Sequence, residues 1–142
     1  MSHHLILRVV AKFLIPLILV YALYVHFHGE LSPGGGFQAG VLVASAFILH
    51  ALIFGLRKTR PVAAPGALRA LAACGVLLYA GTGVAGMLLG GAFLDYGVLA
   101  ADPVAGQHLG IVLIELGVLL TVSSVMLLVF YAFAGRQKPE AQ

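Results

Sequence analysis

"LGIVLIELGVLLTVSSVMLLVFYAF", residues 109–133, is an apolar run that contains one charged side chain, Glu115. A helix needs about 20 apolar residues to cross the hydrocarbon core of a bilayer. Three further runs, at about 9–27, 37–56 and 70–93, have a similar length. Lipid offers the backbone no hydrogen-bond partners, so each run predicts a helix. The chain is therefore predicted to be an all-α integral membrane protein, a single domain of four transmembrane helices.

The overall composition points to the same class of protein. Hydrophobic residues make up 61% of the chain and charged residues 9%, whereas a soluble domain carries about 25% charged residues. A single cysteine, Cys74, excludes an internal disulfide and a cysteine-based metal cluster. No segment between the runs is long enough for a soluble catalytic domain. We therefore expect a non-enzymatic protein that contacts the lipid bilayer, with no cofactor and no nucleic-acid partner.

The positions of the basic residues predict the orientation in the membrane. All of them precede or begin the first run, lie between the second and third runs, or follow the fourth; they are Arg8, Lys12, Arg57, Lys58, Arg60, Arg69, Arg136 and Lys138. The two remaining connections carry only acidic charges, at Glu30, Asp95 and Asp102. Cytoplasmic loops are enriched in Lys and Arg. Both termini are therefore predicted to be cytoplasmic, and the 28–36 connection to face outward.

Polar side chains inside the predicted spans are candidates for an ion or proton path. Glu115 lies about a quarter of the way into the fourth run from its outer end. An acid in mid-span costs about 2.5–3.5 kcal/mol on insertion, and such residues usually face protein or water. His108 lies two helical turns before Glu115 and therefore on the same stripe, and Gln38 and His50 add polar groups to the second span. The structural alternative is that these groups only bond neighbouring helices, or that Glu115 reaches the lipid edge. The histidine spacings predict no metal site.

The stretch "SPGGGFQAG", residues 32–40, predicts a tight turn between the first two spans. A proline followed by three glycines cannot continue a helix. The free N–H groups at the start of the second span, near Phe37, form a positive pole that could meet a carboxylate or an anion, or dock on a partner. The alternative is a plain hairpin. The residues assigned to this structural turn are Ser32, Pro33, Gly34, Gly35, Gly36, Phe37 and Gly40.

Two pairs of glycines are spaced four residues apart in the apolar runs. Small residues at this spacing let helices approach closely in lipid. The pair Gly36 and Gly40 and the pair Gly86 and Gly90 are therefore predicted to lie at helix contacts.

Two segments resemble the B subunit of multisubunit Mrp-type sodium/proton antiporters. "HGELSPGGGFQAG" is similar to the family's G-H-x-S/T-P-G-G-G-F-x-G-G stretch, and "VLIELGVLLTV" to the segment in its last span that places an acid, here Glu115, before Gly117 and Val118. Glu30 stands where the family usually has histidine, and Ala39 where it usually has glycine. Together with length and span number, the resemblance covers essentially the whole chain.

The resemblance implies a multi-pass subunit of a bacterial plasma membrane. Its partners would be the other membrane subunits of an antiporter complex, and the transported species would be protons and sodium or another monovalent cation. Two alternatives stay open at this point. One is a membrane-arm subunit of a complex I-like energy-converting hydrogenase or oxidoreductase, and the other is an assembly scaffold that contacts no ion.

Overall fold

The computed structural model describes residues 2–29 and 34–136. Four of its helices are long and apolar enough to cross a membrane, which confirms the predicted all-α membrane fold. Within the described residues the chain forms no strand. In chain order the elements are α1 (Ser2–Phe27), α2 (Gly36–Phe54), α3 (Leu56–Thr59), α4 (Pro65–Leu88), the 3-10 helix η1 (Tyr96–Leu99) and α5 (Pro103–Ala134).

The ends of α4 differ from the predicted span 70–93. The helix begins earlier, at Pro65, because proline has no N–H to leave unpaired in the first turn and its φ already suits a helix. It ends earlier, at Leu88, and Gly90 follows with a φ of 90°. This left-handed backbone conformation suits glycine and is incompatible with continuing a right-handed helix.

The other three spans also have ends that the apolar runs misplaced. α5 begins at Pro103, well before the predicted residue 109, because the Asp102 carboxylate caps the helix by accepting from the Val104 N–H at 3.3 Å. α1 begins at Ser2 instead of near residue 9, because basic residues are compatible with the helix end outside the lipid. α2 ends at Phe54, where Gly55 turns the chain with a φ of 92°.

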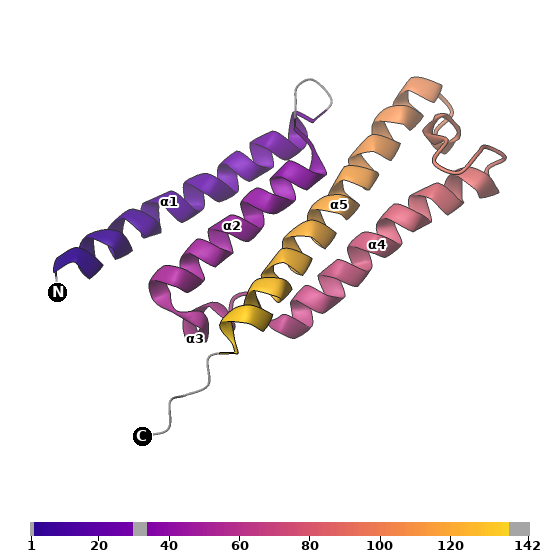
Figure 1. The fold of residues 1–142 in the computed structure, drawn as a ribbon. Helices are drawn as coiled ribbons and strands as arrows, with labels where there is room; N and C mark the ends of the chain where they lie inside the picture. The colour runs from indigo at the N-terminus through magenta and orange to yellow at the C-terminus, as the bar shows by residue number, and fades with distance from the viewer. Residues whose placement is uncertain (1, 30–33, 137–142) are drawn as a thin grey trace.

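The four long helices lie side by side in a single layer, in the order α1, α2, α5, α4 (Figure 1). α2 packs against α1 on one side and α5 on the other, and α5 packs against α2 and α4. In the most apolar window of each span, between 11% and 28% of the residues are buried within the chain. Most of the apolar surface of the layer is therefore available to lipid or to other proteins.

The first turn of α1 and the last turn of α5 lie at the same end of the layer, which also carries α3 and the start of α4 (Figure 1). We call this the basic end, because the described lysines and arginines lie in the first half of α1, in or just after α3, near the start of α4 and just after α5. The glycine turn between α1 and α2 lies at the opposite end. That the basic end faces the cytoplasm stays a prediction of the positive-inside rule.

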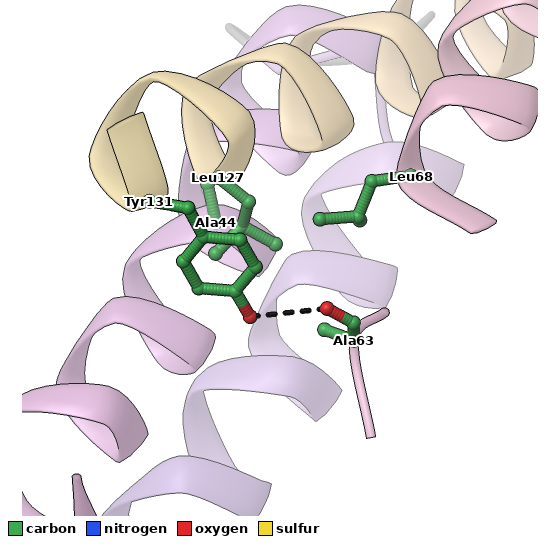
Figure 2. Packing of buried hydrophobic residues seen from close by; sticks show 5 residues of the cluster. All are labelled: Ala44, Ala63, Leu68, Leu127 and Tyr131. Atoms are coloured by element: carbon green, nitrogen blue, oxygen red, sulfur yellow. Dashed lines mark hydrogen bonds between the residues drawn. The ribbon is translucent and has the colours of Figure 1, made fainter. Parts of the chain in front are cut away.

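A small apolar core ties the basic end together. It consists of Ala44, Ala63, Leu68, Leu127 and Tyr131 (Figure 2). The Tyr131 hydroxyl donates to the Ala63 carbonyl oxygen at 3.1 Å, so the end of α5 is bonded to the connection that precedes α4. The guanidinium of Arg60 lies 5.9 Å from the centroid of the Tyr131 ring, within the range of a cation–π contact.

The two predicted glycine pairs have different outcomes. Gly36 and Gly40 both face α5, and a β-carbon built at Gly40 would lie 3.1 Å from the Leu119 carbonyl oxygen, so this helix contact is confirmed. The prediction for Gly86 and Gly90 is wrong. Gly90 lies beyond the end of α4, and Gly86 packs beneath the following loop, where its β-carbon would be 3.1 Å from the Asp95 carbonyl oxygen.

Contact between α4 and α5 is made instead by a glycine from each helix. A β-carbon built at Gly75 would lie 2.5 Å from the Gly117 carbonyl oxygen, and one built at Gly117 would lie 2.8 Å from the Gly75 carbonyl oxygen. The Thr121 hydroxyl, one turn further along α5, donates to the Gly117 carbonyl oxygen at 2.9 Å. These small residues let the two backbones approach closely without a hydrophobic driving force.

Candidate functional site

The start of α2 packs directly on Glu115 of α5. Gly35, the residue before the helix, has a φ of 118°, and a β-carbon built on it would lie 3.0 Å from Oε1 of Glu115. A β-carbon at Gly36 would overlap the backbone carbonyl of Glu115. The glycines of the predicted turn are therefore required by close approach as well as by backbone conformation. Of the contacts considered for this turn, the structure shows a carboxylate, and it comes from the same chain.

The end of α1 closes the third side of this site. A β-carbon built at Gly29 would lie 2.6 Å from Oε1 and 2.9 Å from Oε2 of Glu115. The Gly35 N–H donates to the Val25 carbonyl oxygen at 3.3 Å, which attaches the turn to the last turn of α1. The half-buried Glu115 carboxylate thus lies where α1 ends, α2 begins and α5 passes. We call this the Glu115 site.

The electrostatic environment of the Glu115 site favours negative charge. The N-terminus of a helix carries about half a positive elementary charge on its unbonded N–H groups, and Gly35 and Gly36 place the start of α2 against the carboxylate. The described lysines and arginines lie at the basic end, far along the layer. The helix terminus therefore supplies positive potential here, within the part of the chain that the structure describes.

Gln38 belongs to the same site. Its side-chain Oε1 lies 3.9 Å from the β-carbon position of Gly35, the same position that is 3.0 Å from Oε1 of Glu115. The amide of Gln38 and the carboxylate of Glu115 therefore flank one glycine, although the sequence places them on different spans. Gln38 is exposed on the surface of the layer.

His108 lines an open hollow that borders the Glu115 site at this end of α5. The hollow has a volume of about 790 Å³, and His108, Gln107, Asp102 and Gly29 are among its lining residues. Gly29 also contacts the Glu115 carboxylate, so the hollow reaches the edge of the site. The exposed imidazole of His108 thus shares this hollow with Gly29, which lies beside the Glu115 carboxylate.

His50 lies elsewhere. The helical rise of 1.5 Å per residue puts it about 18 Å from Gln38 along α2, at the basic end. Its Nδ1 is 2.7 Å from Oγ1 of Thr59, and the Thr59 hydroxyl donates to the Gly55 carbonyl oxygen at 3.1 Å. Thr59 therefore joins the His50 imidazole to the Gly55 carbonyl oxygen through its single hydroxyl group. His50 therefore attaches α3 to α2, which is the structural alternative considered for it.

The structure also buries a histidine that the sequence does not single out. His26, in the last turn of α1, is 6% exposed, and its Nδ1 has no hydrogen-bond partner among the described residues. A histidine at the end of a span is usually solvated. The available signal was Ala22, a fully buried small residue one turn earlier, which marks the face of α1 that packs inward.

The remaining sequence-predicted turn residues add little to the site. Phe37 is exposed at the start of α2 and Gly34 approaches the Val25 carbonyl oxygen, whereas Ser32 and Pro33 lie outside the described residues. In residues 2–29 and 34–136, no group of three His, Cys, Asp or Glu side chains is placed to hold a metal ion.

Comparison with known proteins assigns a family to this arrangement. The family model described as "Domain related to MnhB subunit of Na+/H+ antiporter" matches residues 6–128. The chain belongs to this family. Among its MnhB relatives are proteins of Staphylococcus aureus strains Newman, JH1 and COL named as antiporter subunit mnhB2, each 35% identical over 133 residues, or 92% of this chain and 94% of theirs.

Membership of the MnhB family confirms the resemblance seen in the glycine turn and the Glu115 segment. The relatives are antiporter subunits, which places the chain with transport proteins rather than with an enzyme family. Membership of this family and the four apolar helices together make the chain a multi-pass protein of the plasma membrane.

Proposed function

We propose that this MnhB-related chain is a membrane subunit of a sodium/proton antiporter, and that Glu115 carries a proton or a monovalent cation on the exchange path. The family match and the antiporter relatives support the first part. The observation that supports the second part is the position of the carboxylate, half-buried in an apolar layer and held between Gly29, Gly35 and the start of α2.

The geometry suits a group that changes its charge in the membrane. Ionised Glu115 is stabilised by the N-terminus of α2, so loss of its proton does not leave an uncompensated charge in lipid. Oxygen ligands suit hard cations, and the Gln38 side-chain oxygen and the Glu115 carboxylate share one glycine contact. The hollow beside His108 and Gly29 gives water or an ion a route to this point.

Other membrane subunits are required to complete the path. The Glu115 site lies within a single layer of helices, and no other part of this chain covers most of the two faces of that layer among the described residues. A cation path across lipid must be enclosed by protein or water on all sides. Neighbouring subunits would therefore supply the opposite wall, and the isolated chain would not exchange ions.

The assembly-scaffold alternative also has a structural basis. Gly36 packs on the backbone of Glu115, and the carboxylate fills the space beside Gly29. In this alternative, the sole role of Glu115 is to hold α1, α2 and α5 together. The hydrogenase-arm alternative gains nothing from the relatives, which are named as antiporter subunits.

Glu115→Gln separates the ion-path role from the scaffold role. Glutamine keeps the shape and hydrogen bonding of the side chain but cannot release a proton, so we expect an assembled complex with reduced sodium/proton exchange or a shifted pH profile. Glu115→Asp should retain more activity. Exchange is measured in inverted membrane vesicles over a pH series, with complex content determined on a native gel.

The matched control is Asp95→Asn. Asp95 lies outside the spans and accepts from the Gly97 N–H through Oδ1 at 3.3 Å, a bond that asparagine can also accept. This variant should exchange ions like the wild type. If Glu115→Gln matches it at every pH, Glu115 is structural and the scaffold is the better account.

A further inference from the structure

A groove at the basic end of the layer is unrelated to the Glu115 site. It has a volume of about 320 Å³ and is bordered by α1, the end of α2 and α3. Its lining residues are Lys12, Ile15, Pro16, His50, Phe54 and Lys58. We call it the lysine groove, because Lys12 and Lys58, which come from helices distant in sequence, both border a wall that is otherwise apolar apart from His50.

The charges of the lysine groove are not balanced by acids of the described chain. Lys12 and Lys58 are both exposed. Of the described carboxylates, Asp95 and Asp102 lie in the connection between α4 and α5 at the opposite end, and Glu115 lies at the glycine turn. Two cationic side chains beside one cavity make its potential positive, which favours an anion as its occupant.

The groove continues along an apolar surface toward the middle of the layer. A second hollow of about 230 Å³ shares Ile15 and His50 with the lysine groove, and its other lining residues include Leu19 and Phe47. Leu19 lies two turns beyond Lys12 on α1, in the direction of the membrane centre. The surface thus changes from cationic to apolar with increasing depth, as the two parts of a phospholipid do.

His50 and Thr59 fix the shape of this surface. The hydrogen bond between His50 and Thr59 holds α3 against α2, and Thr59 is completely buried. Lys58, the residue before Thr59, is therefore carried by an anchored segment rather than by a free loop. A preorganised cation costs less conformational entropy when it binds an anion.

We propose that the lysine groove binds one anionic phospholipid, with its phosphate between Lys12 and Lys58 and the start of an acyl chain along Ile15 and Leu19. Basic pockets between transmembrane helices are suited to anionic headgroups. The apolar hollow that continues from the lysine groove can hold an acyl chain, so the groove favours a lipid over a free phosphate ion. This inference is independent of the proposed antiport role, because it depends on residues at the other end of the layer.

The test uses the intact complex purified from membranes and reconstituted in nanodiscs of phosphatidylglycerol and phosphatidylethanolamine in equal amounts. Bound lipid is identified by native mass spectrometry after extensive detergent washing. A basic residue near the surface contributes about fivefold to binding of an anionic lipid, so Lys12→Gln with Lys58→Gln should weaken retention of one phosphatidylglycerol by roughly 30-fold. The charge-preserving pair Lys12→Arg and Lys58→Arg should retain it.

The matched control is Arg69→Gln with Arg136→Gln, which removes the same charge from the same end, but from α4 and from the segment that follows α5. Equal losses of lipid in the two double variants would overturn the proposal, since the effect would then be one of overall charge. For the wild type, equal retention of both lipids after washing would also overturn it. So would displacement of the lipid by inorganic phosphate, or cross-linking of Lys58 to a carboxylate of a neighbouring subunit.

Discussion

Gly36→Ala adds a single methyl group at the closest contact between α2 and α5. The new β-carbon would overlap the carbonyl oxygen of Glu115 and lie 2.9 Å from its Cα. Both obstacles are backbone atoms in the interior of a long helix, so neither can move away by a rotamer change. The helices must separate, and separation withdraws the Glu115 carboxylate from the start of α2.

The magnitude follows from two opposing terms. Overpacking costs about 1–3 kcal/mol, and a backbone obstacle places this contact at the upper end of that range. Alanine is favoured over glycine by about 1 kcal/mol inside a helix, but Gly36 is the first residue of α2, so only part of this gain offsets the cost. The net destabilisation of the α2–α5 contact is therefore about 2 kcal/mol, a factor of roughly 30 in the equilibrium between packed and separated helices.

Gly81→Ala is the matched control. Gly81 is inside α4, and a β-carbon built there meets no atom within 4 Å, so only the favourable helix term of about 1 kcal/mol applies. The assay heats membranes that contain the complex and determines, on native gels, the temperature at which half of the chain has left it. Gly36→Ala should lower that temperature and Gly81→Ala should leave it unchanged or raise it. Equal or greater retention of Gly36→Ala would refute the close-packing argument.

Two further expectations concern the basic end. Tyr131→Phe removes the hydroxyl that donates to the Ala63 carbonyl oxygen at 3.1 Å and should destabilise the chain by about 1 kcal/mol, measurable in the same heating assay; unchanged retention would show that water replaces the bond at no cost. In a Cys74→Ser background, an impermeant maleimide added to intact cells should label Val98→Cys and not Arg57→Cys. The reverse pattern would invert the predicted topology.

The number and type of the long helices follow from the apolar runs, but their arrangement does not. Each span is apolar on all sides, so hydrophobic periodicity gives no face that must be buried and no order within the layer. The spacing of small residues indicated only some of the contacts between helices. Gly36 and Gly40 marked the contact of α2 with α5, whereas Gly90 matched the same spacing and ended α4 instead.

For the site, sequence reasoning identified the groups and missed some of their partners. A carboxylate was one of several contacts considered for the glycine turn, and protein was one of several environments considered for Glu115, but only the structure places the two together. His50 was grouped with the path candidates because it is a polar side chain inside the second span; the structure gives it a partner, the fully buried Thr59, that the sequence did not indicate. Such pairings depend on how α3 folds back, which local sequence does not specify.

The four long helices α1, α2, α5 and α4 form one layer (Figure 1), so the protein separates two spaces and encloses neither. The layer has two broad faces, and a different neighbouring subunit can pack on each of them. A copy that fails to find its neighbours leaves the half-buried acid Glu115 facing lipid. Such a copy would be a natural substrate for membrane quality-control proteases, so cellular levels of the chain should follow those of its partners rather than its own rate of synthesis.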